Sequence, residues 1–296
     1  MNRAVAPPAP VLVLGAVASV QSGAAIATRL FPDVGPTGTL LLRLGLSAVL
    51  LLAIARPRWS GHGRSDALLA VGYAVVLAAM NGTFYEALDR IPLGIAVTVE
   101  FVGPLAVAVA GSRRRLDVLW VVLAAVGVAL LTSGGGNDID LVGIGWAATA
   151  GVFWAAYILL TQRLGRAFPG ATGLAIGLTI GTVCVLPFGI AAAGTKLLRP
   201  DVLGRGAAVA LLSSALPYSL ELFALRRMRA SVFSVLMSLE PAMAAVSGLL
   251  FLGQHLKLRE WIAVGCVMTA SIGATRSNRR VTTVEPGATP VPAGVA

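Results

Sequence analysis

The chain contains ten apolar stretches of roughly 20 residues each, and this pattern limits its fold more than any other feature. An α-helix of that length crosses the hydrocarbon core of a bilayer, which is about 30 Å thick. The composition agrees, because 57% of the residues are hydrophobic and only 12% are charged, a balance that excludes a soluble single domain. We therefore predict an all-α polytopic membrane protein with ten transmembrane helices. The stretches lie near 10–30, 37–55, 67–86, 92–111, 117–133, 141–162, 171–193, 206–225, 231–252 and 260–276.

Basic residues are distributed unevenly over the connections between these stretches. With both termini in the cytoplasm, fifteen of the 23 Lys and Arg residues face the cytoplasm, seven face the other side, and Arg43 lies within a stretch. Cytoplasmic loops of membrane proteins carry such an excess of positive charge. The net charge of +10 is thus explained by membrane topology, and we expect no nucleic-acid partner.

The second half of the sequence repeats the first at an offset of 137 residues. This offset aligns Pro32 with Pro169 and Pro104 with Pro241 without a gap. Each half then holds five stretches, an odd number, so the second half must enter the membrane upside down relative to the first. Inverted repeats of this kind are typical of secondary transporters.

The repeat predicts two inverted five-helix units, at 10–140 and 141–277, followed by a disordered tail at 281–296. It also argues against a cleaved signal peptide at the N-terminus, because the first stretch has a counterpart near 147–168 that no peptidase would remove.

Ionisable residues inside membrane spans are costly and are therefore functional candidates. Glu100 and Glu240 lie near the middle of their predicted spans, one in each half. Pro104 leaves the carbonyl of Glu100 without a helical N–H partner, and Pro241 does the same for Met237. A carboxylate beside a free carbonyl can hold a proton or an ammonium group.

Each ionisable residue also has a structural interpretation. Glu100 and Glu240 are alternatively hydrogen-bonded between helices or paired with Arg43. Glu221 lies near the end of its stretch, where an interfacial ion pair with a neighbouring arginine is the alternative to a transport role. Arg43 is either a counter-ion to a glutamate or an anchor that binds a substrate carboxylate with both branches of its guanidinium.

Other polar side chains at depth are candidates for lining a substrate cavity, although Trp and Tyr also occur in the interfacial belts of membrane proteins. Pro217 predicts a disturbed helix in the eighth stretch, because it frees the carbonyl of Ser213. The additional candidates are Gln21, Asn81, Trp154, Tyr157 and Tyr218.

Signatures of an enzyme are missing from the sequence. His62 and His255 lie in connections on opposite sides, which excludes a His-ligated metal or a Ser-His-Asp site, and there is no phosphate-binding GxxxxGK[ST] motif. Cys184 and Cys266 lie in apolar stretches and lack a metal or redox spacing. We expect no enzymatic activity, no metal and no cofactor, so transport must draw on an ion gradient.

Several segments resemble the threonine and homoserine exporters of the drug/metabolite transporter superfamily, whose halves are EamA domains. The segments that carry the resemblance are 92–97, 100–101, 103–108, 112–114 and 120–124 in the first half, and 213–221, 236–242, 244–248 and 251–253 in the second. The resemblance covers roughly residues 10–276. It implies a ten-helix inner-membrane exporter driven by the proton motive force, and it assigns no role to single residues.

We predict a proton-coupled exporter of small neutral amino acids, threonine and homoserine first, in the bacterial inner membrane with both termini cytoplasmic. A zwitterion needs an anion for its ammonium and a cation for its carboxylate, and Glu100 or Glu240 together with Arg43 supplies both. The alternative is a transporter of the same superfamily that exports a drug, a nucleobase or another metabolite. The expected partners are the amino-acid substrate, protons and the lipid bilayer, and a homodimer is one of the oligomeric states considered.

Overall fold

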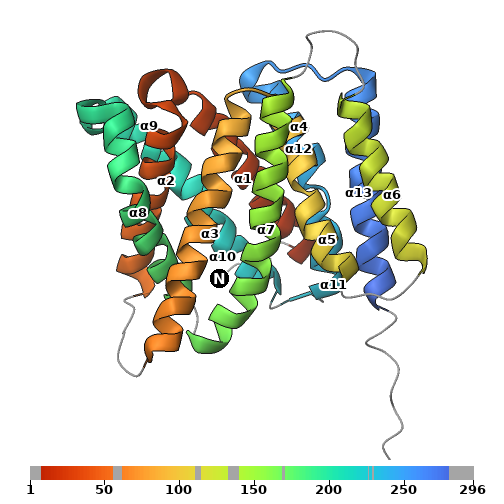
Figure 1. Cartoon of the computed structure of the whole chain (residues 1–296), viewed down its shortest axis with the longest axis horizontal. Coiled ribbons are helices and arrows are strands. Elements are labelled where there is room, and N and C mark those ends of the chain that lie inside the picture. Colours follow the sequence, from red (N-terminus) through yellow and green to blue (C-terminus); the bar gives the residue numbers. More distant parts are fainter. Residues whose placement is uncertain are drawn as a thin grey trace, which may run out of the picture.

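The computed structural model describes residues 8–55, 62–110, 115–132, 140–168, 171–225, 227–228 and 230–279, and all regular structure within them is helical (Figure 1). The α-helices are α1 (Ala9–Thr28), α2 (Phe31–Ala55), α3 (Arg64–Leu88), α4 (Leu93–Glu100), α5 (Val102–Ala110), α6 (Arg115–Thr132), α7 (Leu141–Ala167), α8 (Thr172–Ala193), α9 (Pro200–Ala210), α10 (Leu216–Leu225), α11 (Ala230–Met237), α12 (Glu240–Leu252) and α13 (Leu258–Arg279). A 3₁₀ turn, η1 (Gly194–Leu198), follows α8, and a π-helical turn, η2 (Leu211–Ala215), joins α9 to α10.

Membrane-spanning helices are confirmed as the main building element. Within the described part of the chain, seven helical segments are long and apolar enough to cross a membrane. The other predicted spans, near 117–133, 206–225 and 260–276, are also helical, as α6, as α9 with η2 and α10, and as α13, but they are not among these seven. The protein is therefore an all-helical polytopic membrane protein, and the total of ten spans stays a prediction.

Two of the spans are broken in the middle. Helix α4 ends at Glu100 and α5 begins at Val102, while α11 ends at Met237 and α12 begins at Glu240. Glu100 and Met237 are the residues whose carbonyls the following prolines leave without a helical N–H partner. The breaks thus follow from the local sequence.

The first break is packed tightly against α7. A Cβ atom on Gly103 would overlap the backbone oxygen of Gly151, and a Cβ on Gly151 would lie 2.7 Å from the carbonyl oxygen of Glu100. Small residues allow such close approach of helices in a membrane, where apolar burial supplies no driving force between them. Glycines at both positions therefore hold the end of α4 directly against α7.

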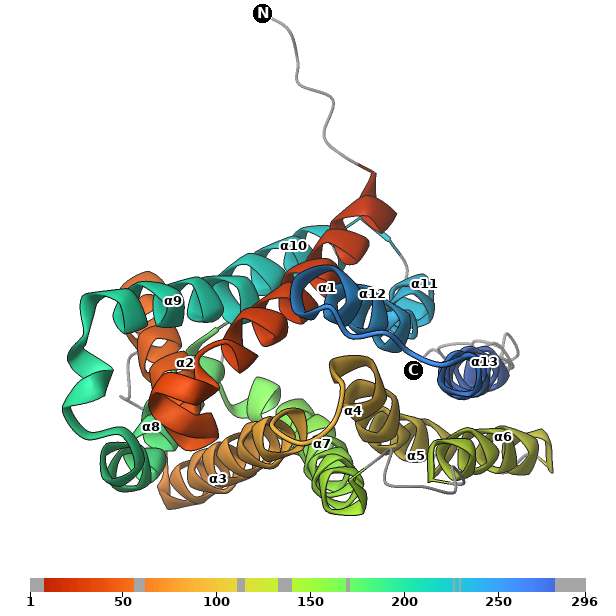
Figure 2. The ribbon, with the colours of Figure 1, turned by 90° about the horizontal axis from the view of Figure 1, so that it is seen from above.

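The two halves of the chain are interleaved. Helix α1 packs against α10 and α12, α3 packs against α7, and α4 packs against α12. Helix α2 contacts α8 at one end of the molecule, and α6 contacts α13 at the other. Seen from above, α3, α7, α5 and α6 form one row, while α9, α10, α1 and α12 form a second row facing it (Figure 2).

Polar contacts gather several connections on one face of the bundle, at the upper side of Figure 1. These connections are the ones that the charge count predicts to lie on the less basic side of the membrane. The contacts are Arg29 with the carbonyl of Phe251, Arg205 with Asp33 at 2.8 Å, Arg90 with Asp140 at 3.1 Å, and the N–H of Leu93 with Gln254 Oε1 at 3.0 Å. On the basic side, His62 stacks on Phe168 with ring centroids 4.3 Å apart.

Candidate functional site: a charged cavity between the helix rows

A cavity of about 260 Å³ lies between the helix rows and contains most of the predicted site residues. Gln21, Arg43, Asn81, Glu100, Trp154, Tyr157, Glu221 and Glu240 all line it. The side chain of the ninth candidate, Tyr218, lies outside what the structure describes, although its backbone belongs to α10. The rest of the lining is formed by Val20, Ala24, Leu77, Met80, Phe84, Val97, Ser213, Pro217 and Met237.

Charged groups of both signs meet in this cavity. Glu100 is 7% exposed and Glu240 8% exposed, while Arg43 and Glu221 are half-buried. Glu100 lies within Coulombic reach of both Arg43 and Glu240, and Glu240 lies within that of Glu221. The cavity therefore offers a cation near one glutamate and a pair of acidic groups near the other.

Arg43 is oriented by Tyr85 of α3, a pairing that the sequence does not indicate. The guanidinium Nη1 donates a hydrogen bond of 3.3 Å to the hydroxyl of Tyr85, and its central carbon lies 5.5 Å from the centre of the ring. Tyr85 is fully buried and packs against Phe31 and Phe84. The sequence shows only that Tyr85 is a polar residue within an apolar stretch, and this does not indicate Arg43 of α2 as its partner.

The helix breaks place both Glu100 and Glu240 at helix ends. Glu100 is the last residue of α4, and Glu240 is the first residue of α12. The N-terminus of a helix favours negative charge, because its first N–H groups have no intrahelical acceptors. Glu240 and Glu100 thus occupy different electrostatic surroundings, although they lie at related points of the two halves.

The turn η2 replaces the simple helix break expected before Pro217. A π-helical turn bonds each carbonyl to the N–H five residues later, and the N–H of Leu216 bonds to the carbonyl of Leu211. Because of this wider turn, the helix continues through Pro217 although proline has no N–H to donate. It also brings the side chain of Ser213 to the cavity, where Ser213 is 7% exposed.

Aromatic side chains of α7 close the cavity on the opposite side. Trp154 meets Phe101 edge to face with ring centroids 5.5 Å apart, and Tyr157 lies 5.3 Å from the ring of Tyr73. Asn81 donates a hydrogen bond of 2.8 Å to the carbonyl of Leu77 in its own helix, which leaves its oxygen for other partners.

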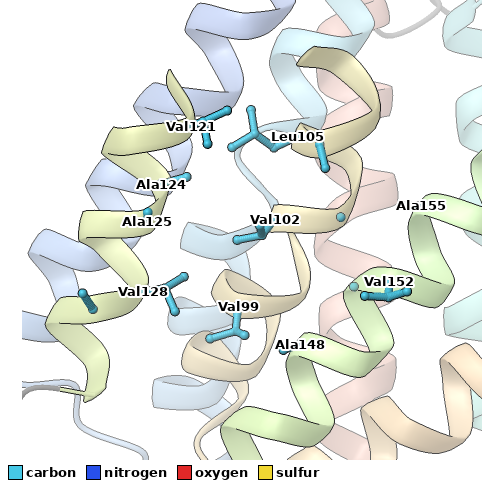
Figure 3. Close-up of a pocket in the computed structure, with 14 residues that line it drawn as sticks. Val99, Val102, Leu105, Val121, Ala124, Ala125, Val128, Ala148, Val152 and Ala155 are labelled. Carbon is cyan, nitrogen blue, oxygen red and sulfur yellow. The ribbon is translucent and has the colours of Figure 1, made fainter. Parts of the chain in front are cut away.

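A larger cavity of about 650 Å³ lies between α4 and α5 on one side and α6 and α7 on the others (Figure 3). Only Val, Leu, Ala and Gly residues line it, among them Val99, Leu105, Val128 and Val152. Val152 is 69% exposed, so this cavity opens on the outer surface of the helices. With no polar side chain in its lining, it cannot pair the charges of a zwitterion, and the smaller charged cavity is the candidate substrate site.

Membrane-spanning helices around a small cavity with buried charges and helix breaks are typical of membrane transporters. The model of the EamA-like transporter family matches residues 141–276. The threonine/homoserine exporter RhtA of Escherichia coli strain K12 is 44% identical over 91% of this chain and 92% of its own length. The RhtA protein of Salmonella typhimurium strain LT2 is also 44% identical, over 92% of both chains. The chain therefore belongs to the EamA-like transporter family, and within it to the group of RhtA.

Two more distant matches are a second transporter and a solved structure with the same fold. The uncharacterized transporter YwfM of Bacillus subtilis is 25% identical over 72% of this chain and 74% of its own length. A solved crystal structure with 18% identity matches 93% of this chain and 99% of its own with a TM-score of 0.59, which indicates a shared fold. The family is one of transporters, so the chain acts as a transporter rather than as an enzyme.

Proposed function

We propose that this protein exports threonine and homoserine across the bacterial inner membrane in exchange for protons. The observation that carries the proposal is the cavity that holds Arg43, Glu100 and Glu240 at the helix breaks. The relatives named threonine/homoserine exporter, at 44% identity over nine-tenths of the chain, support the choice of substrate.

In this proposal the charged ends of the amino acid bind at opposite charges of the cavity. Arg43 binds the carboxylate, because its planar guanidinium can donate two parallel hydrogen bonds. Glu100 binds the ammonium group, since it is the glutamate within Coulombic reach of Arg43 and the two ends of an amino acid are close together. Tyr85 holds Arg43 in place through its hydroxyl group.

Glu240 is our candidate for the proton carrier. Its Coulombic neighbours are two acids, Glu221 and Glu100, whereas Glu100 has the cation Arg43 beside it as well as Glu240. Two carboxylates that share a buried site cannot both carry their charge at low cost, so one of them is suited to take up and release a proton.

Proton coupling is tested with Glu240→Gln and Glu100→Gln in proteoliposomes. Glutamine imitates a carboxyl group that stays protonated, so Glu240→Gln should abolish export driven by a pH gradient but keep substrate exchange, which moves no net proton. Glu100→Gln leaves Arg43 without its acidic neighbour and should weaken both export and exchange. Full pH-driven export by both variants would show that the glutamates are structural.

The proposal includes two inverted five-helix repeats, at 10–140 and 141–277. The contacts support it. Helix α1 of the first half packs against α10 and α12 of the second, and its counterpart α7 packs against α3 and α5, which are the counterparts of α10 and α12. Helices α2 and α8, which contact each other, are counterparts near the offset of 137 residues. Helices α6 and α13, which also contact each other, are the fifth helices of the two halves, and their first residues are 143 apart. The residues at the helix breaks, Phe101 and Ser238, are separated by the same offset.

We also propose that both termini lie in the cytoplasm. The support is the charge count, because the connections and helix ends on the side of the upper face of Figure 1 carry seven Lys and Arg residues and those predicted on the opposite side carry fifteen.

Counterflow of labelled threonine tests the substrate. Proteoliposomes loaded with unlabelled threonine or homoserine should accumulate labelled threonine transiently, and those loaded with a nucleobase or an amphipathic drug should not. Accumulation driven only by a nucleobase or a drug would replace the amino acid with that class of substrate.

A further inference from the structure

The part of the cavity wall formed by α1 and η2 carries two buried polar atoms that lack a partner. Gln21 is 3% exposed and Ser213 is 7% exposed, and both line the cavity. Among the described residues, Gln21 Oε1 and Ser213 Oγ have no hydrogen-bond partner. Nearly all buried polar atoms of native proteins are hydrogen-bonded. Four side-chain atoms of the described residues are exceptions, and besides Trp120 Nε1 and Arg259 Nε, which belong to other regions, two of the four belong to this one cavity wall and point to a bound molecule.

The neighbouring polar side chains are satisfied within the protein. Ser19 Oγ donates 2.7 Å to the carbonyl of Leu212, and the hydroxyls of Ser214 and Ser47 are 2.8 Å apart. The unpaired atoms are therefore not a general property of this region. They belong to two of the residues that line the cavity, whereas Ser19, Ser47 and Ser214 do not line it.

The packing of α1 against η2 holds Ser213 in place. A Cβ atom on Gly23 would collide with the hydroxyl oxygen of Ser213 and would lie 3.2 Å from its backbone nitrogen. The hydrogen bond of Ser19 to Leu212, one turn earlier on α1, fixes the same contact. The Ser213 hydroxyl is thus positioned before any substrate binds, which lowers the ordering cost of binding.

The chemistry of this wall is neutral. An amide oxygen accepts a hydrogen bond, and a serine hydroxyl both donates and accepts one. The charged groups Arg43, Glu100 and Glu240 come from α2, α4 and α12, that is, from other parts of the cavity. We propose that Gln21 and Ser213 form the subsite for the side-chain hydroxyl of the transported amino acid and select hydroxylated substrates over their deoxy analogues.

This inference rests on the proposed export of threonine and homoserine, and it adds the residues that set the preference. A site that hydrogen-bonds a substrate hydroxyl rejects an analogue without it, because the polar groups of the site are then left buried and unpaired. Valine replaces the hydroxyl of threonine with a methyl group of similar size. 2-Aminobutyrate is the deoxy analogue of both threonine and homoserine.

The test is competition by these amino acids against labelled threonine in proteoliposomes. For the wild type, threonine and homoserine should compete at least about tenfold better than valine and 2-aminobutyrate. Ser213→Ala and Gln21→Met should each reduce that ratio by about fivefold or more, mainly by weakening the binding of the hydroxylated substrates. The ratio does not depend on how much protein folds.

Ser214→Ala is the matched control, since it removes a buried hydroxyl of the same turn that is already bonded to Ser47. It should leave the ratio unchanged. The assignment of the subsite is overturned if the preference for hydroxylated amino acids is unchanged in both Ser213→Ala and Gln21→Met. It is also overturned if the preference drops equally in Ser214→Ala. In either case water is the partner of Gln21 Oε1 and Ser213 Oγ. Transport of threonine without any preference over valine also overturns it while leaving the proposed function intact. A wild-type protein that transports none of the four amino acids contradicts the proposed function itself.

Discussion

Replacing Arg43 with lysine separates the two roles considered for this residue. Lysine keeps the positive charge but loses the planar fork that binds a carboxylate through two hydrogen bonds. It also loses the present geometry toward Tyr85, with a hydrogen bond of 3.3 Å and a distance of 5.5 Å from guanidinium carbon to ring centre.

The expected size of the effect follows from these contacts. Losing one of two charge-assisted hydrogen bonds to the substrate carboxylate costs about 1.5–3 kcal/mol. That corresponds to a roughly 10- to 150-fold weaker apparent affinity for threonine. Tyr85→Phe keeps the ring and removes only the hydroxyl group that orients Arg43, so we expect a smaller loss of roughly two- to tenfold.

The assay is the concentration dependence of threonine counterflow, together with thermal unfolding of each purified variant in detergent. If Arg43 anchors the substrate, Arg43→Lys weakens the apparent affinity and leaves the melting temperature close to that of the wild type. An unchanged affinity combined with a lower melting temperature would refute the anchor role and identify Arg43 as a structural counter-ion.

Three further predictions concern packing, a helix cap and topology. Gly103→Ala should destabilise the protein by about 1–3 kcal/mol, because the new Cβ overlaps the backbone of α7; Gly145→Ala, whose Cβ would have nothing within 4 Å, is the control, and equal melting temperatures for the two variants contradict the tight packing. The pKa of Asp140 is held below its usual value by hydrogen bonds from Arg90 and from the first N–H groups of α7, so its stabilising effect is present at neutral pH and is lost as the pH falls through that lowered pKa. The difference in melting temperature between wild type and Asp140→Asn should accordingly shrink at acidic pH. A difference that stays constant would argue against a stabilising role of the Asp140 carboxylate as the N-cap of α7. A cysteine introduced in place of Arg114 should not react with an impermeant reagent added outside intact cells. Labelling from outside would show that the orientation is the opposite of the one proposed.

Much of the fold could be predicted from local sequence. The apolar stretches identify membrane-spanning helices because hydrocarbon forces every backbone polar group into internal hydrogen bonds. Pro104 and Pro241 predict free carbonyls at Glu100 and Met237, since a missing N–H acts on the carbonyl four residues earlier, and α4 and α11 end at these two residues. These are local effects, and they do not depend on which helices become neighbours.

The candidate site was predicted in its residues but not in its pairings. Glu100, Glu240 and Arg43 were recognisable because ionisable groups are rare and costly inside a membrane span. Nothing in the sequence indicated that Arg43 bonds to Tyr85. A pairing of Arg43 with a glutamate was one of the alternatives, but the sequence did not decide which glutamate lies near Arg43 or that Glu221 lies near Glu240.

The sequence by itself determined that the chain is a helical membrane protein with charged groups at mid-depth, because the cost of polar groups in lipid is the same whatever the neighbours are. Only the tertiary structure decided which of those groups meet in one cavity and which polar atoms, among the described residues, remain unpaired there. Side-chain partners depend on how closely helices approach and how they are rotated, and these are set by distant contacts such as Gly23 against Ser213 and Gly103 against Gly151. The π-helical turn at 211–215 was likewise decided by tertiary structure, because Ser213 is held at the cavity by the packing of α1 against this turn.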